Sequence, residues 1–122
     1  MADHIQRLLA RTLRREEAFQ ETCWRPSADI YQTADGWLVK FDLAGVVPQE
    51  LELAIRGRTL TVSGVRRDWS AAECRNSYSM EINYNRFSRT IELPADLQEA
   101  ELSTQYRDGM LLVRFITQRG GT

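Results

Sequence analysis

Strict alternation of apolar and polar residues is the feature that most constrains how this chain can fold. In WLVKFDL, every second side chain from Trp37 to Leu43 is apolar, whereas Lys40 and Asp42 point to the opposite face. A period of two is typical of a half-buried β-strand. The same spacing recurs in LELAIR, TLTVSG, YSMEINY, FSRTIEL and MLLVRFI. Many short strands with little helix between them predict an all-β fold, an immunoglobulin-like antiparallel β-sandwich.

Turn residues separate these segments at the expected places. Gly57-Arg58 stands between two strand patterns and predicts a two-residue hairpin. Asp108-Gly109 stands in the same way between ELSTQY and MLLVRFI, and predicts a tight hairpin that returns the last strand to the sandwich. Pro94 ends the strand pattern that precedes it.

The first residues follow a different period. Residues 3–21 are predicted to form an amphipathic helix that Asp3 caps, with one apolar stripe along it: Ile5, Leu8, Leu9 and Leu13. Such a short helix cannot bury its stripe on itself. We therefore expect three parts, an N-terminal segment (residues 1–23), a β-sandwich (24–116) and a short tail (117–122).

Composition argues against several classes of protein. The formal net charge is -1, whereas a nucleic-acid-binding domain would normally carry a basic surplus. The basic pair Arg66-Arg67 is followed by Asp68 and is interpreted as solvated surface. No apolar run approaches the ~20 residues that a membrane-spanning helix needs. We expect no nucleic-acid partner and no membrane span.

The two cysteines suggest a compartment rather than a chemistry. Cys23 and Cys74 lie far apart in the sequence and form no CxxC motif. Widely spaced thiols are typical of a reducing environment, so we expect a cytoplasmic protein in which both act as small packing groups.

Residues that could carry catalysis are scarce. His4 is the single histidine and lies in the N-terminal segment, outside the predicted β-sandwich. No spacing of His, Cys and carboxylates predicts a metal site, and no GxxxxGK[ST] motif predicts a phosphate loop. We therefore expect no catalytic residues, no metal and no cofactor, although sequence cannot show whether two carboxylates come together in space.

Two features of the strand region do not fit a simple sandwich. The inward phase of FSRTIEL contains Arg89, which would need a carboxylate or carbonyl partner if half-buried, or would extend to water. The connection from Arg66 to Ser77 is long for a hairpin and carries Trp69. A long connection with an aromatic residue predicts a segment that packs away from its own sheet.

Taken in order, five segments resemble the α-crystallin domain of the small heat-shock proteins. They are WRPSADIYQT, LAGVVPQELEL, RTLTVSG, FSRTIELP and YRDGMLLV, and the resemblance runs from Trp24 to about Ile116. The matching residues include Pro26, Asp29, Ile30, Tyr31, Leu43, Gly45, Val46, Phe87, Arg89, Ile91, Leu93, Pro94, Tyr106, Asp108, Gly109 and Leu111. Ala44 and Thr104 depart from the family's usual Pro and Ala, and the tail TQRGGT lacks the family's Ile-x-Ile motif.

The resemblance implies an ATP-independent holdase chaperone that binds unfolding client proteins through apolar surface. One candidate surface is the N-terminal stripe defined above. Another is a groove between LELAI and ELSTQY, where Leu53, Ile55, Leu102 and Thr104 would face each other, unless they simply belong to the sandwich core. The alternative from another class is a CS-like co-chaperone or adaptor that docks on one partner without holding clients.

The resemblance also implies assembly. In bacterial and plant members of the family, the segment that corresponds to Arg66–Ser77 carries a strand that crosses to a partner chain. We therefore expect a homodimer by strand exchange, with Ile30, Tyr31, Trp69 and Arg89 at the interface and Arg89 paired to a carboxylate. Without the Ile-x-Ile motif, such dimers are not expected to build readily into large shells.

Overall fold

The computed structural model describes residues 23–117. Two single 3₁₀ turns, η1 (Pro48–Glu50) and η2 (Ala71–Glu73), interrupt a succession of β-strands. The strands are β1 (Ala28–Gln32), β2 (Gly36–Asp42), β3 (Glu52–Arg56), β4 (Thr59–Arg66), β5 (Asn85–Glu92), β6 (Glu101–Arg107) and β7 (Met110–Ile116).

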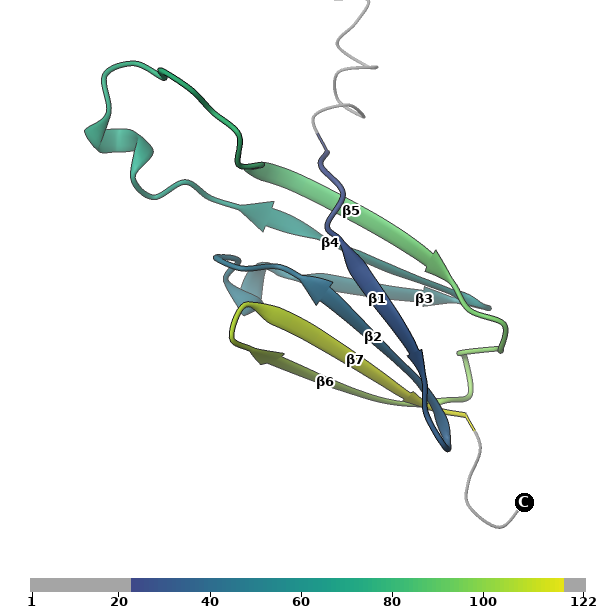
Figure 1. Cartoon of the computed structure of the whole chain (residues 1–122). Helices are drawn as coiled ribbons and strands as arrows, with labels where there is room; N and C mark the ends of the chain where they lie inside the picture. The colour runs from purple at the N-terminus through teal and green to yellow at the C-terminus, as the bar shows by residue number, and fades with distance from the viewer. Residues whose placement is uncertain (1–22, 118–122) are drawn as a thin grey trace, which may run out of the picture.

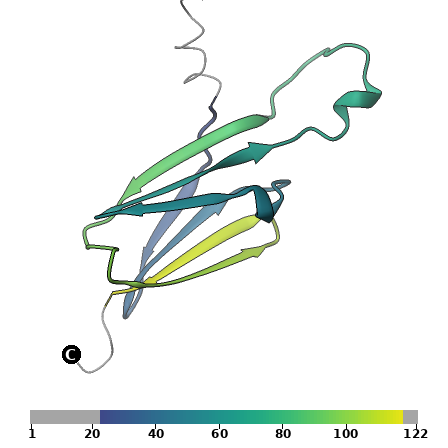
Figure 2. The same cartoon turned by 180° about the vertical axis from the view of Figure 1, so that it is seen from behind.

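The strands form two antiparallel sheets that pack face to face. One sheet has the order β1-β2-β7-β6 and the other the order β3-β4-β5. The two layers are visible in Figure 1 and, from behind, in Figure 2. The predicted antiparallel β-sandwich is confirmed. Strands β3 and β6 lie at the edges of their sheets on one side of the molecule, and β1 and β5 lie at the edges on the other side.

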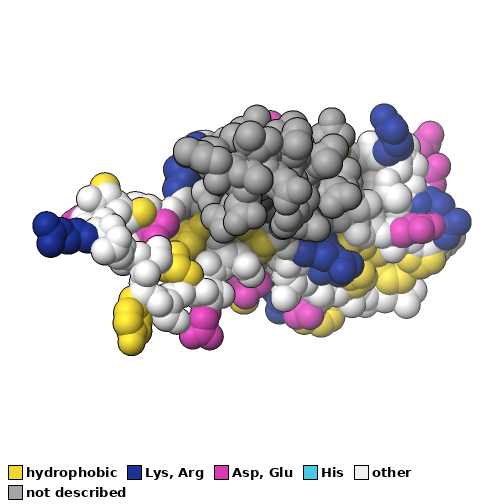
Figure 3. All heavy atoms as spheres, turned by 90° about the horizontal axis from the view of Figure 1, so that it is seen from above, with side chains coloured by type: hydrophobic (Ala, Val, Ile, Leu, Met, Phe, Trp, Pro, Cys, Tyr) yellow, Lys and Arg dark blue, Asp and Glu magenta, His cyan; other side chains and the backbone are white. Residues whose placement is uncertain are grey.

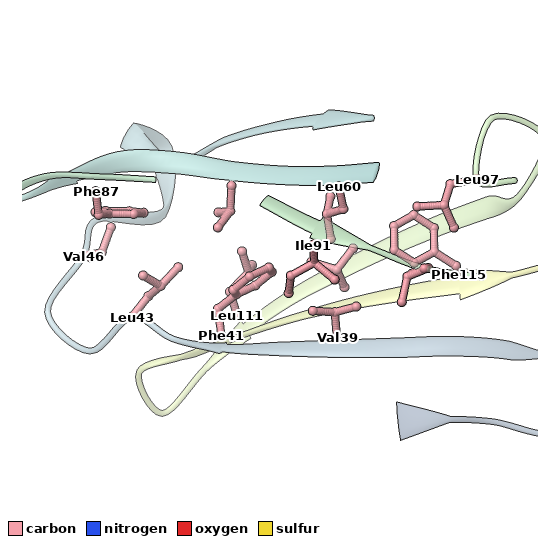
Figure 4. Close-up of a cluster of buried hydrophobic side chains, with 13 residues drawn as sticks. Val39, Phe41, Leu43, Val46, Leu60, Phe87, Ile91, Leu97, Leu111 and Phe115 are labelled. Atoms are coloured by element: carbon pink, nitrogen blue, oxygen red, sulfur yellow. The ribbon is translucent and has the colours of Figure 1, made fainter. Parts of the chain in front are cut away.

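The core fills the space between the sheets, as Figure 4 shows. Alternate residues supply it because successive side chains of a strand point to opposite faces. The buried hydrophobic side chains are Val39, Phe41, Leu43, Val46, Leu60, Val62, Phe87, Ile91, Leu93, Leu97, Leu111, Val113 and Phe115. Leu51, Leu53 and Ile55 of the predicted inward set are partly buried and pack against this cluster.

Both predicted two-residue hairpins are present. β3 pairs with β4 up to Arg56 and Thr59, and Gly57 between them has φ of 60°. β6 pairs with β7 up to Arg107 and Met110. The two residues of that turn have left-handed backbones, with φ of 53° at Asp108 and 80° at Gly109. Asp and Gly tolerate this conformation better than other residues, which explains the Asp-Gly pair.

One predicted strand does not form. YSMEINY has the period-two pattern, yet Tyr78–Tyr84 lies in the long connection between β4 and β5, outside any named strand. That connection, residues 67–84, is called the β4–β5 loop below and projects from the sandwich at the upper left of Figure 1. A strand needs a neighbour to pair with its backbone, and the described chain offers this segment none.

The chain enters the sandwich beside β5. Trp24 forms a parallel bridge with Phe87 and exchanges backbone hydrogen bonds with Arg86 and Ser88, at 3.0 and 3.1 Å. The Trp24 and Phe87 rings also pack together, with centroids 5.1 Å apart. The N-terminal helix with its stripe, His4 and residues 118–122 lie outside the described residues, so those predictions remain untested.

Candidate functional site

A groove lies between the edge strands β3 and β6. It has a volume of about 310 Å³ and is lined by Pro48, Leu51, Leu53, Thr104, Tyr106 and Leu111. Each edge strand is paired on one side within its sheet, so its other side presents backbone groups that the sheet does not use. The Tyr106 hydroxyl donates to the Leu43 carbonyl at 2.7 Å, which fixes the ring in the groove wall.

The structure brings two of the four predicted groove residues into this groove. Leu53 and Thr104 line it from opposite strands, whereas Ile55 and Leu102 are not among its lining residues. Ile55 packs against the core, as the alternative interpretation proposed, and Leu102 is 44% exposed on the outer strand. Leu51 and Tyr106 were missed, although each stands two residues from a predicted groove residue and therefore shares its face.

A second apolar surface lies on the β4–β5 loop. Residues 71–83 are all exposed, and the exposed hydrophobic side chains of the loop are Trp69, Tyr78, Met80 and Ile82. Figure 3, which views the molecule from above, shows hydrophobic side chains standing out at the left, where this loop lies. Tyr78, Met80 and Ile82 alternate along the chain and would share one face of an extended segment. We call them the loop row.

The edge strand β1 carries the other predicted contact residues. Ile30 and Tyr31 are 45% and 44% exposed, and β1 pairs only with β2 among the described strands. Lys40 lies 5.3 Å from the Tyr31 ring centroid and 3.9 Å from an Asp29 carboxylate oxygen. These contacts hold the Tyr31 ring beside an edge whose outer side no described strand covers.

Arg89 has the carbonyl partner that the sequence demanded. Its side chain is half-buried on β5, and Nη1 donates to the Pro26 carbonyl at 2.9 Å. Its Nε is buried and has no hydrogen-bond partner within residues 23–117. Burial, and then the nearby charge of Arg25, lower the pKa of Arg89 from its ordinary value. An acceptor group from outside the described chain would satisfy this donor.

Of the pair Arg66-Arg67, interpreted from the sequence as solvated surface, Arg67 is exposed and Arg66 is half-buried. Arg67 donates from Nη2 to Glu50 at 2.8 Å and from Nε to the same carboxylate, which joins the β4–β5 loop to η1. This hydrogen bond and the Arg67 charge lower the pKa of Glu50 and raise that of Arg67. Arg66 is half-buried and bonds to backbone carbonyls rather than to Asp68.

The remaining features of the described residues concern metal ligands, cysteines and membrane-spanning helices. Within residues 23–117, no cluster of three or more His, Cys, Asp or Glu side chains could hold a metal ion. Cys23 and Cys74 are both free. Cys74 is exposed and donates to the Ser70 carbonyl, so its prediction as a packing group was wrong. No helix among these residues is long and apolar enough to cross a membrane.

Curated relatives match over most of the strand region. A small heat shock protein C2 from Rickettsia felis is 27% identical over 70% of this chain and 56% of that protein. An 18 kDa heat shock protein from Streptomyces albus G is 32% identical over 82% of this chain and 72% of that protein. The chain thus spans little more than half the length of some of the relatives that it matches.

Solved structures and a family model agree with the geometry. Heat shock protein 16.0 from Schizosaccharomyces pombe superposes with a TM-score of 0.70 at 25% identity, over 81% of this chain and 93% of that one. The hspA protein from Xanthomonas axonopodis gives 0.65 at 26% identity, over 77% and 94%. The model of the Hsp20/alpha crystallin family matches residues 29–120. The chain belongs to the Hsp20/alpha crystallin family, the small heat-shock proteins.

Proposed function

We propose that the protein is an ATP-independent holdase that binds unfolding client proteins and suppresses their aggregation. The groove between β3 and β6 carries this proposal. An extended client segment would place apolar side chains against Leu51, Leu53 and Tyr106, and its backbone would pair with an unpaired strand edge. Binding of this kind requires apolar surface and free backbone groups, and it needs no catalytic residue.

Aggregation of a heated model client, followed by light scattering, tests the proposal. Near-stoichiometric protein is expected to reduce scattering equally with and without ATP. Thr104→Lys would place a charge in the groove and is expected to weaken protection, because an apolar client would have to desolvate the ammonium group. Ser103→Lys is the matched control, since Ser103 is the adjacent exposed residue and points to the other face.

The alternative is a CS-like adaptor that docks on one specific partner. It predicts that even a several-fold excess of the protein leaves client scattering unchanged, which would contradict the holdase proposal. The N-terminal stripe gives a further test of client binding. Deleting residues 1–21 is expected to weaken protection while leaving the β circular-dichroism signal and the melting temperature nearly unchanged. A large loss of thermal stability would instead make the stripe part of the core.

The second part of the proposal is a reciprocal homodimer by strand exchange. The loop row has the spacing of a strand and has no neighbouring strand within residues 23–117, whereas β1 is an edge strand whose outer side no described strand covers. The loop of one chain would pair with β1 of the other, beside Ile30 and Tyr31. Trp69, which is 86% exposed, would pack on the partner, and a partner carboxylate would accept from Arg89.

Sedimentation and mass photometry test this assembly. The intact chain is expected to be mainly dimeric, and deletion of residues 68–75 is expected to give monomers because the loop could no longer reach the partner. Ser103→Lys, remote from the loop and from β1, is expected to stay dimeric. A stable monomer of the intact chain, or a large closed shell, would contradict the proposed dimer.

Localisation completes the proposal. We place the protein in the cytoplasm, without a nucleic-acid partner, a membrane span or a cofactor. The free thiols of Cys23 and Cys74 support a reducing compartment, because an exposed thiol such as Cys74 would readily oxidise elsewhere. Fractionation of cells that express the protein at native levels tests this placement.

A further inference from the structure

Arg66 joins the two ends of the β4–β5 loop. It is the last residue of β4, and its Nε donates to the Asn83 carbonyl at 2.8 Å, where the chain returns toward β5. Nη2 donates to the same carbonyl, and Nη1 donates to the Ala44 carbonyl at 3.2 Å. One guanidinium therefore bonds the end of β4 to the returning loop and to the connection between β2 and β3.

Aromatic rings hold the same guanidinium in place. Its central carbon lies 4.1 Å from the centroid of the Trp24 ring and 5.7 Å from that of Tyr84. The Trp24 ring is fixed in turn, because its Nε1 donates to the Asn85 carbonyl at 3.2 Å and it packs against the buried Phe87. A chain of contacts thus runs from Phe87 in the core through Trp24 to Arg66 at the loop, and a cation over a ring face is favourable.

Gly45 and an open pocket border the Arg66 side chain. A Cβ added at Gly45 would stand 3.6 Å from the Arg66 Cδ, an ordinary contact distance. The pocket has a volume of about 340 Å³ and is bounded on the loop side by Trp69, Ile82 and Tyr84. The β4–β5 pairing ends at Arg66 and Asn85, so beyond that pair the Arg66 hydrogen bonds continue the closure of the loop.

We propose that Arg66 is the positioning residue that sets the direction in which the β4–β5 loop leaves the sandwich. With its root closed by the hydrogen bonds of Arg66, the loop has a defined exit. The consequence for assembly rests on the proposed dimer: the exit holds the loop row away from its own sandwich, where a second copy can pair with it. Arg66 acts through the loop.

Lysine cannot replace arginine in this role. The guanidinium is planar and offers donors in a fixed fork, so it can stack on Trp24 while it bonds to two carbonyls. An ammonium group keeps the charge but does not stack as a plane and has no such fork. Arg66→Lys therefore removes the positioning geometry with little change in charge or length. Arg67→Lys is the matched control at the next residue, because a lysine there can still pair with Glu50.

Distances between spin labels test the positioning directly. One label is placed on the native Cys74 of the loop and one on Glu92→Cys at the far end of β5, in a Cys23→Ser background. Labelled chains are mixed with an excess of unlabelled chains, so that the measured distances lie within one chain. Arg66→Lys is expected to broaden the distance distribution markedly, whereas Arg67→Lys is expected to leave it nearly unchanged. An unchanged distribution for Arg66→Lys would overturn the proposal.

Dimer dissociation, measured by sedimentation, tests the consequence for assembly. If only about a tenth of the Arg66→Lys loops hold the competent direction, the dissociation constant of the reciprocal dimer rises about a hundredfold, because both chains must supply a competent loop. Arg67→Lys is expected to stay within about twofold of the unsubstituted chain. A broadened distance distribution with an unchanged dissociation constant would overturn the proposed effect of Arg66 on dimer formation. If the intact chain does not dimerise, the proposed dimer fails, and the distance measurement alone decides the role of Arg66. Circular dichroism of each variant shows whether the sandwich is retained.

Discussion

Strand β2 and the loop row have the same spacing of apolar residues and opposite environments. Val39 and Phe41 on β2 are completely buried, whereas the three side chains of the loop row are each at least 60% exposed. Periodicity determines which side chains share a face, but burial needs a second surface opposite that face. The other sheet provides such a surface for β2, whereas no surface among the described residues covers the loop row.

The largest effect is expected when one apolar side chain is removed from each of these two regions. Phe41→Ala is expected to lower the free energy of unfolding by about 3–5 kcal/mol, because it leaves a cavity in the core. Tyr78→Ala is expected to change it by less than about 0.5 kcal/mol when the protein is dilute enough to be monomeric. Urea unfolding measures both. A comparable loss for the two variants would show that the loop packs on its own sandwich.

The next test asks whether a second chain supplies the missing surface. Met80→Ser combined with Ile82→Ser is expected to raise the dimer dissociation constant at least about a hundredfold, since burial of each side chain contributes about 1.5–3 kcal/mol. Ser79→Ala alters the other face of the same segment and serves as the control. Sedimentation equilibrium measures the constants. Equal dissociation constants for the double serine variant and for Ser79→Ala would show that the loop row does not form the dimer contact.

A smaller contrast separates the two hairpins. Gly109 and Gly57 both have left-handed backbones, but a Cβ on Gly109 would lie 3.0 Å from the Ala44 Cβ, whereas one on Gly57 would have no neighbour within 4 Å. Gly57→Ala is expected to cost about 1–2 kcal/mol from backbone strain alone, and Gly109→Ala more because of the added contact. Thermal unfolding shows which of the two variants loses more stability. A larger loss for Gly57→Ala than for Gly109→Ala would contradict this explanation.

The smallest expected effect concerns the ion pair between η1 and the loop. Arg67 lowers the pKa of Glu50 in the folded protein. The pair therefore stabilises the folded protein at pH values above the ordinary pKa of a glutamate. This stabilisation is lost as the pH falls through the lowered pKa that Glu50 has in the folded protein. Glu50→Gln is expected to flatten this acid-side dependence slightly, and high salt is expected to do the same because the pair is exposed. Melting temperatures measured across the acid range check both.

Local patterns predicted the parts of the fold that depend on local chemistry. The alternation in WLVKFDL and the Asp108-Gly109 pair each depend on neighbouring residues, and both had the predicted structure. The same alternation wrongly predicted a strand at Tyr78–Tyr84, because a strand forms only where another strand pairs with it. The half-buried Arg89 was found because a charge broke an apolar face.

The candidate site was predicted less completely, for the same reason. Leu53 and Thr104 line the groove between β3 and β6, whereas Ile55 and Leu102 do not, because the sequence of a single strand does not determine the offset between the two sheets. The contacts of Arg66 were not predicted from the sequence. Its partners are the backbone carbonyls of Ala44 and Asn83 and the ring of Trp24, and no sequence spacing identifies a backbone carbonyl as a partner.

The bridge between Trp24 and β5 brings the chain's entry and the loop's return to one point on the surface. The Trp24 backbone bonds to Arg86 and its indole bonds to Asn85, the residue at which β5 begins. Two binding segments joined at one point by short connections experience an effective concentration in about the millimolar range. A ligand held beside Trp24 would therefore reach the β4–β5 loop of the same molecule far more often than that of another, and weak affinities at the two places would combine into one long-lived attachment.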